Sequence, residues 1–178
     1  MRTTIETIIE TIDRFTQRMG SALSWLGLAM MLVTVTVVFL RYGFDIGWIA
    51  MQETVLYLHA IIFMLGMSYT LQKDGHVRVD VFYRNFSPRG QALVNCFGFL
   101  FLLAPVCIFI TWMSWDYVLA SWAIRETSAE AGGIPGVFLL KSLILMMTGT
   151  VLLQGFAECL RSVSVIAGWA GGEGDEHD

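Results

Sequence analysis

Two charged side chains, Glu53 and Lys141, each lie a few residues inside a long apolar run of the sequence. Charged groups within membrane-spanning segments are rare and often mark proton or substrate pathways. Both are expected at similar depth near the outer surface, where an ion pair between them, or extension of both side chains to the interface, is the structural interpretation. A proton-carrying or substrate-binding role is the functional alternative.

His59 lies deeper in the same run as Glu53 and belongs to a stripe with Gln52, Gly66 and Thr70, at intervals of seven and four residues. Small and polar residues along one helix face favour close helix–helix contact with interhelical hydrogen bonds. Bis-histidine haem ligation would need a second histidine within the spans, and the other two histidines lie outside the apolar runs. The stripe is therefore interpreted as a contact surface.

The segment 73–83 alternates His76, Arg78 and Asp80 with three valines, so an extended chain would place the polar groups on one face. A metal site formed by His76 and Asp80, with Asp74 nearby, is one hypothesis, but it has few ligands. A loop that holds helix ends together or docks a partner is the favoured interpretation. The three cysteines form no C-x-x-C motif, which argues against a disulfide oxidoreductase.

Four apolar runs, at about 20–40, 49–71, 92–115 and 138–160, are each long enough to cross a bilayer as a helix. Hydrophobic residues make up 56% of the 178-residue chain and charged residues only 15%. The sequence therefore predicts an all-α membrane protein with a four-helix transmembrane domain over residues 20–162. Ser87 is expected to cap the third helix with Pro88 at its first position, and Pro105 is expected to kink it.

The two ends of the chain differ in composition from the spans. Residues 1–19 carry apolar residues at helical spacing, which predicts an amphipathic helix in the membrane interface, although an extension of the first span fits equally well. Residues 163–178 are rich in glycine and acids and are expected to form a flexible cytoplasmic tail. This tail accounts for the net charge of −4, and no basic patch indicates a nucleic-acid partner.

The distribution of basic residues predicts the orientation. Eight basic residues lie in the N-terminus, the second loop and the C-terminal segment, against three on the opposite side. By the positive-inside rule, both termini and the 72–91 loop should be cytoplasmic. The expected topology is N-in and C-in.

Several segments resemble the small membrane subunit of tripartite ATP-independent periplasmic (TRAP) transporters. They are Gln52-Glu53 through Gly66 to Tyr69-Thr70-Leu71, the segment 75–80, Glu126 through Gly133, Leu140-Lys141-Ser142, and Leu153-Gln154-Gly155. The resemblance covers roughly residues 20–162 and includes length, span count and topology. The segment around His76 to Asp80 is its most specific part.

The resemblance implies a non-enzymatic subunit in a bacterial inner membrane. It would join a large permease subunit that holds the sodium and substrate sites, so that no cofactor is expected in this chain. A periplasmic binding protein would deliver an organic anion, usually a carboxylate, and the small subunit would brace the static scaffold among membrane lipids. The main alternative is a stand-alone, proton-coupled small exporter using Glu53, and a membrane enzyme is disfavoured because no paired catalytic residues are evident.

Overall fold

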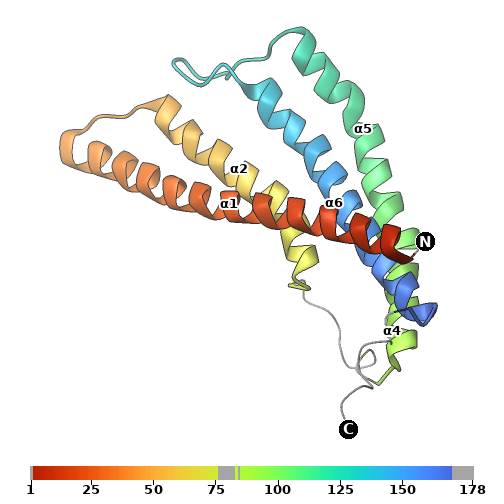
Figure 1. The fold of residues 1–178 in the computed structure, drawn as a ribbon. Helices are drawn as coiled ribbons and strands as arrows, with labels where there is room; N and C mark the ends of the chain where they lie inside the picture. Colours follow the sequence, from red (N-terminus) through yellow and green to blue (C-terminus); the bar gives the residue numbers. More distant parts are fainter. Residues whose placement is uncertain (1, 76–82, 84, 170–178) are drawn as a thin grey trace.

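The computed structural model describes residues 2–75, 83 and 85–169, and these form helices and connecting turns without a strand. In chain order the elements are α1 (Arg2–Phe44), α2 (Ile49–Gln72), α4 (Pro88–Gly98), the π-helical turn η1 (Phe99–Leu103), α5 (Ala104–Ala123) and α6 (Val137–Ile166). Figure 1 shows α4, η1 and α5 as one uninterrupted rod. Four helical segments are thus long and apolar enough to cross a membrane, which confirms the predicted number of spans.

Helix α1 is much longer than the predicted first span. Its 43 residues continue through position 20 without a break, and correspond to roughly 65 Å at 1.5 Å of rise per residue. Residues 2–19 are therefore part of α1 and not a separate helix, as the alternative of an extended first span requires. Their predicted apolar stripe packs only in part, since Ile12 of that stripe is buried together with Thr16, whereas Ile8 and Phe15 of the stripe are exposed.

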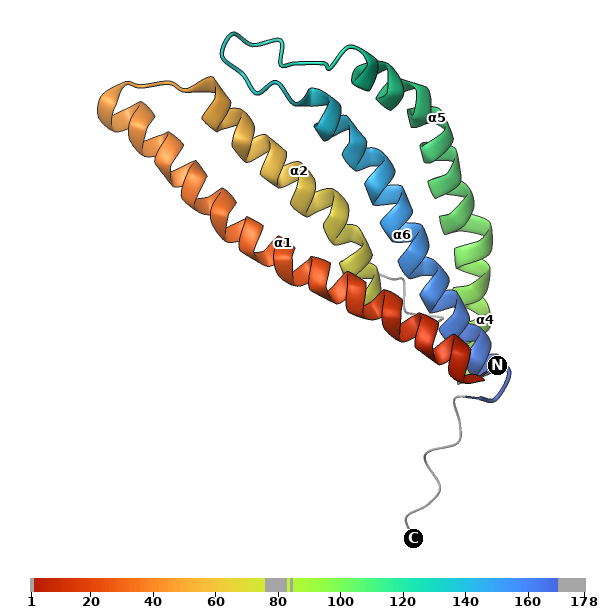
Figure 2. The ribbon, with the colours of Figure 1, turned by 45° about the horizontal axis from the view of Figure 1, so that its top comes forward.

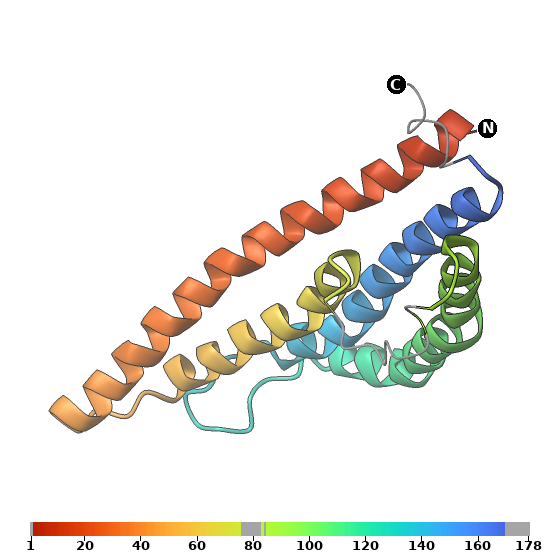
Figure 3. The same ribbon diagram turned by 90° about the horizontal axis from the view of Figure 1, so that it is seen from below.

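The helices are arranged as a fan with α6 between α2 and α5 (Figure 2). Helix α1 packs along α2 and crosses the end of α6, as the view from below shows (Figure 3). Close approach of α1 to α2 depends on Gly20, because a Cβ atom there would collide with the ring of Tyr69. Helix α6 has more buried residues than any other described helix. Many large apolar side chains of the other helices face outward, as expected of a surface covered by lipid or by another membrane protein.

The third span begins as the sequence predicts. The Ser87 hydroxyl accepts a hydrogen bond from the Gly90 N–H at 3.2 Å, and Pro88 occupies the first helical position. The expected kink at Pro105 takes a different form, because the helix widens into η1, which ends two residues before the proline, and the rod of α4, η1 and α5 is curved (Figure 2). Gly155 of α6 lies against Phe99 of this turn, where a Cβ atom would be too close.

Two ends of the fan can be distinguished. The terminal end holds the start of α1 and the end of α6, and the loop end holds the 124–136 loop between α5 and α6 (Figure 1). Both terminal helices therefore meet at the same end, as an even number of spans requires. That this end faces the cytoplasm stays a prediction.

The C-terminal boundary differs from the predicted one, because α6 continues to Ile166, four residues into the segment expected to be tail. The predicted flexibility of residues 170–178 lies outside the described residues.

Candidate functional site

The loop clasp, as we call Glu53, Glu126, Ser128, Ile134 and Lys141, ties the 124–136 loop to α2 and α6 at the loop end. Glu53 accepts hydrogen bonds from the Ser128 hydroxyl and, at 2.5 Å, from the Ile134 N–H. Lys141 Nζ donates to Glu126 Oε2 at 2.5 Å. A side chain at Gly133 would intrude on Ser128 and Glu53, so this glycine allows the loop to close over the carboxylate.

The Glu53–Lys141 ion pair, one of the two structural alternatives, is not the contact that either group makes. The 124–136 loop supplies a partner for each of the two charged groups. Glu53 accepts a hydrogen bond from the Ile134 N–H, and Lys141 pairs with Glu126. The ammonium of Lys141 also lies 4.0 Å from the centre of the Tyr117 ring. Glu126 and Lys141, both predicted as candidates, are brought together, and their contact joins the start of α6 to the loop that precedes it.

Glu126 lies outside the predicted spans, and its surroundings favour the charged form. The Lys141 ammonium and then the Ser121 hydroxyl, which donates to Glu126 Oε2 at 2.6 Å, hold the pKa of this carboxyl below its usual value. The carboxylate is therefore ionised at neutral pH and serves as an acceptor. This environment suits a structural contact.

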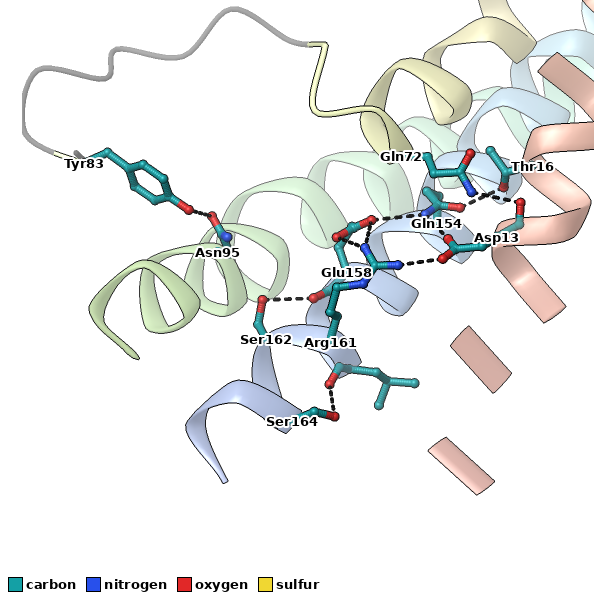
Figure 4. A network of polar contacts seen from close by, with 11 residues as sticks. Asp13, Thr16, Gln72, Tyr83, Asn95, Gln154, Glu158, Arg161, Ser162 and Ser164 are labelled. Carbon is teal, nitrogen blue, oxygen red and sulfur yellow. Dashed lines mark hydrogen bonds and ion pairs between the residues drawn. The ribbon is translucent and has the colours of Figure 1, made fainter. Parts of the chain in front are cut away.

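The terminal network consists of Asp13, Thr16, Gln72, Gln154, Glu158 and Arg161 (Figure 4). The guanidinium of Arg161 lies 2.6 Å from carboxylate oxygens of both Asp13 and Glu158. Gln154 donates to Asp13 Oδ1 at 3.0 Å. These contacts join the first turns of α1 to the last turns of α6.

The centre of the terminal network is buried. Gln154 is 0% exposed and Thr16 is 1% exposed, and the Thr16 hydroxyl donates to Gln154 Oε1 at 2.8 Å. Gln72 adds the end of α2 by donating to the Asp13 carbonyl at 2.8 Å. Paired polar groups in such a place fix the relative position of three helices.

Gln154 is a candidate from the sequence alone, whereas its partners in the terminal network are not. Asp13, Thr16 and Gly20 recur at three and four residues on α1, and Gln154, Glu158 and Arg161 recur at four and three on α6. Each set is a stripe of polar or small residues on one helix face, and this spacing is the signal that could have identified them. Pairing the two stripes requires the extended α1, which sequence alone left open.

The predicted contact stripe of α2 lies on the surface of the fan. Gln52 and His59 are exposed, and the His59 ring stacks on Phe63 with a centroid distance of 6.2 Å. An open groove of about 670 Å³ runs between α1 and α2, and we call it the α1–α2 groove. Residues that line it include Gly20, Ser24, Gly27, Phe63, Gly66 and Thr70.

Two glycines of the α1–α2 groove have no packing role within the chain. A Cβ atom at Gly27 or Gly66 would meet no other atom within 4 Å. Glycine within a helix costs roughly 0.5–1 kcal/mol relative to alanine, and neither site offsets this cost by intrachain packing. These two positions leave the groove open to the surroundings of the chain.

Other predicted features have different outcomes. Cys96 of α4 and Cys159 of α6 lie side by side with their Sγ atoms 3.2 Å apart, and Cys107 is buried. His76, Arg78 and Asp80 lie outside the described residues, so the metal and loop hypotheses there stay predictions. In the rest of the chain, no group of three or more His, Cys, Asp or Glu side chains is arranged to hold a metal ion.

Comparison with known proteins yields one match. The family model of the DctQ component of tripartite ATP-independent periplasmic transporters matches residues 30–165, which is more than half of the chain. The match includes α2, α4, η1, α5 and nearly all of α6, but it leaves out residues 2–29 of α1. No curated protein and no solved structure matches the chain.

Proposed function

Because the chain belongs to the DctQ component family of tripartite ATP-independent periplasmic transporters, we propose that it braces the large permease subunit of a sodium-coupled importer of organic anions. Carboxylates are the proposed substrate class, and a periplasmic binding protein delivers them to the large subunit. Sodium and substrate bind to that subunit. This chain contributes no catalytic group.

The distribution of charge is the observation that carries this proposal. In the described helices, every charged side chain lies toward one of the two ends, and the middle of each span has none. Lys141 and Glu126 are paired in the loop clasp at the loop end, and Arg161 and Asp13 are paired in the terminal network at the terminal end. A substrate anion crossing this chain would meet no charged group in the middle of the bilayer. A subunit with a supporting role needs helices whose ends are held together, and the charged groups do this.

Glu53 illustrates the point. A proton-coupled exporter needs a carboxylate that alternates between charged and neutral forms at an accessible position. Glu53 instead receives two hydrogen bonds from the loop, at the edge of the span. Nothing in the contacts of Glu53 supports the stand-alone exporter.

The α1–α2 groove is the proposed binding site for a transmembrane helix of the large subunit. Open glycines allow close backbone approach. The exposed His59 and Gln52 do not line the groove but lie further along α2 toward the loop end, where they can donate or accept hydrogen bonds that lipid tails cannot supply. The proposed orientation places the terminal end in the cytoplasm of a bacterium, with the chain in the inner membrane. The excess of basic residues at that end supports this orientation.

Purification from native membranes tests the proposal. The tagged chain, extracted in mild detergent, should elute in a fixed ratio with one large permease subunit, identified by mass spectrometry. A chain that elutes as a self-associated dimer of full transport activity would contradict the proposal and revive the exporter.

A further inference from the structure

Helix α5 carries an acid and two tryptophans on one face, and neither the family nor the proposed function uses them. Trp112, Trp115 and Asp116 recur at three and four residues with Ile108 and Thr111 one turn below. With Leu152 of α6 they line an open cavity of about 510 Å³, which we call the α5 slot. Thr111 forms its base by donating to Thr148 of α6 at 2.8 Å.

Asp116 has no partner in the described part of the chain. It is exposed and makes no hydrogen bond or ion pair there, unlike Glu53 and Glu126 at the same end. The indole rings of Trp112 and Trp115 are also exposed, at 79% and 52%. A carboxylate beside two indole faces is a combination that attracts an organic ammonium group, through charge pairing and cation–π contact.

The position of the slot along the helix indicates what carries the ammonium group. Asp116 immediately follows the predicted third span, at residues 92–115, and therefore lies at the boundary of the hydrocarbon core. Ile108 lies two turns deeper, at roughly 12 Å, and continues the slot as an apolar surface toward the bilayer centre. The polar end of the slot, at Asp116, therefore lies at the depth of the lipid head groups. The apolar end, at Ile108, lies at the depth of the acyl chains.

From this geometry we infer that the α5 slot binds an aminophospholipid, with the head-group ammonium at Trp112, Trp115 and Asp116 and an acyl chain along Ile108 and Leu152. The surrounding α4–α5 surface is bulky and apolar, with exposed Phe101, Phe109 and Met113, which suits contact with lipid. Helix α5, which carries most of the slot, lies on the other side of α6 from α2 (Figure 2). Lipid binding and partner binding can therefore be lost separately.

The test uses the complete chain, purified with its large partner, stripped of lipid by detergent and analysed by native mass spectrometry. Phosphatidylethanolamine and phosphatidylglycerol with the same acyl chains are added in turn. Wild type is expected to bind phosphatidylethanolamine about fivefold more tightly than phosphatidylglycerol. Asp116→Asn should abolish the preference. Trp112→Leu should lower the fivefold preference to about twofold.

Asp45→Asn is the matched control, because Asp45 is an exposed acid at the loop end outside the slot. Its backbone has a φ of 54°, a conformation that asparagine accepts as readily as aspartate. An unchanged preference in Asp116→Asn, or equal loss in Asp45→Asn, would overturn the inference. So would a zero-length carboxyl–amine cross-link between Asp116 and a lysine of the large subunit, because the slot would then be a protein interface.

Discussion

The α1–α2 groove and the outer surface of α4–α5 are both open to the membrane, yet they are built from different residues. The groove presents Gly27 and Gly66 with free space above them and has polar His59 close by. The α4–α5 surface presents large side chains such as Phe101 and Phe109, with Asp116 near its outer edge. Exposed surfaces of a membrane protein can therefore be of two kinds. Small residues allow a neighbouring helix to approach closely, whereas bulky apolar residues suit contact with lipid.

Filling the groove should produce the largest effect. Gly27→Leu and Gly66→Leu add side chains where the chain itself has room, so folding should persist while the partner helix is displaced. We expect at least about a tenfold loss of co-purifying large subunit, equivalent to about 1.4 kcal/mol. The measurement is the ratio of the two subunits after affinity purification.

Gly98→Leu is the matched control for this experiment. A Cβ atom at Gly98 of α4 would also meet no other atom within 4 Å, but this glycine lies outside the groove. The control should retain the partner. If all three variants lose the partner to the same extent, the distinction between the two surfaces fails.

Gln154 is central to the attachment of α1 to α6 at the terminal end. Gln154→Leu leaves the buried Thr16 hydroxyl without its acceptor and removes a donor to Asp13. We expect a loss of about 1–3 kcal/mol in the free energy of unfolding. Titration with SDS in mixed micelles, followed by circular dichroism, measures it.

Gln17→Leu provides the comparison, because Gln17 is an exposed residue of the same region of α1. It should change stability little. Equal effects of the two substitutions would show that the terminal network does not hold the helices.

A smaller effect is expected from the polar group beside the groove. His59→Phe preserves a ring that can stack on Phe63 but removes the hydrogen-bonding nitrogens. Because interhelical hydrogen bonds in membranes average about 0.6 kcal/mol, partner affinity should fall about threefold. Microscale thermophoresis of the separated subunits in detergent would detect this change, and an unchanged affinity would remove His59 from the interface.

The loop clasp should give the smallest effect, and one that depends on pH. Ionised Glu126 stabilises the fold through Lys141, so Glu126→Gln should lower the melting temperature at pH 7. The pKa of Glu126 is held below its usual value near 4.5, so this stabilisation is present above that pH and disappears as pH falls through the lower value in the folded protein. The difference in melting temperature between wild type and variant should close only below pH 4.5, and closure near pH 6 would contradict the assignment.

Local signals predicted the elements well. The second span was expected at 49–71 and is Ile49–Gln72, and Ser87 and Pro88 begin the third helix as capping chemistry requires. Contacts between residues far apart in the sequence were harder to predict. Glu53 and Lys141 lie at the same depth, but the partners of each depend on how the 124–136 loop closes, which spacing along the chain does not encode.

The length of α1 shows a second limit. Amphipathic spacing in residues 1–19 fits an interfacial helix and a continuous one equally well, because both repeat every 3.6 residues. Only the contact of Asp13 and Thr16 with α6 distinguishes a helix that continues from one that turns. The π turn before Pro105 likewise has no signal beyond the proline itself.

The central claim is that this chain braces a transporter and does not itself carry substrate. The most direct measurement is uptake of a radiolabelled carboxylate that the cognate binding protein has been shown to bind, into proteoliposomes that contain this chain alone, the large subunit alone, or both. An inward sodium gradient and the binding protein are supplied each time. We expect sodium-dependent uptake only when both subunits are present. Uptake by this chain alone, or full uptake by the large subunit alone, would contradict the account.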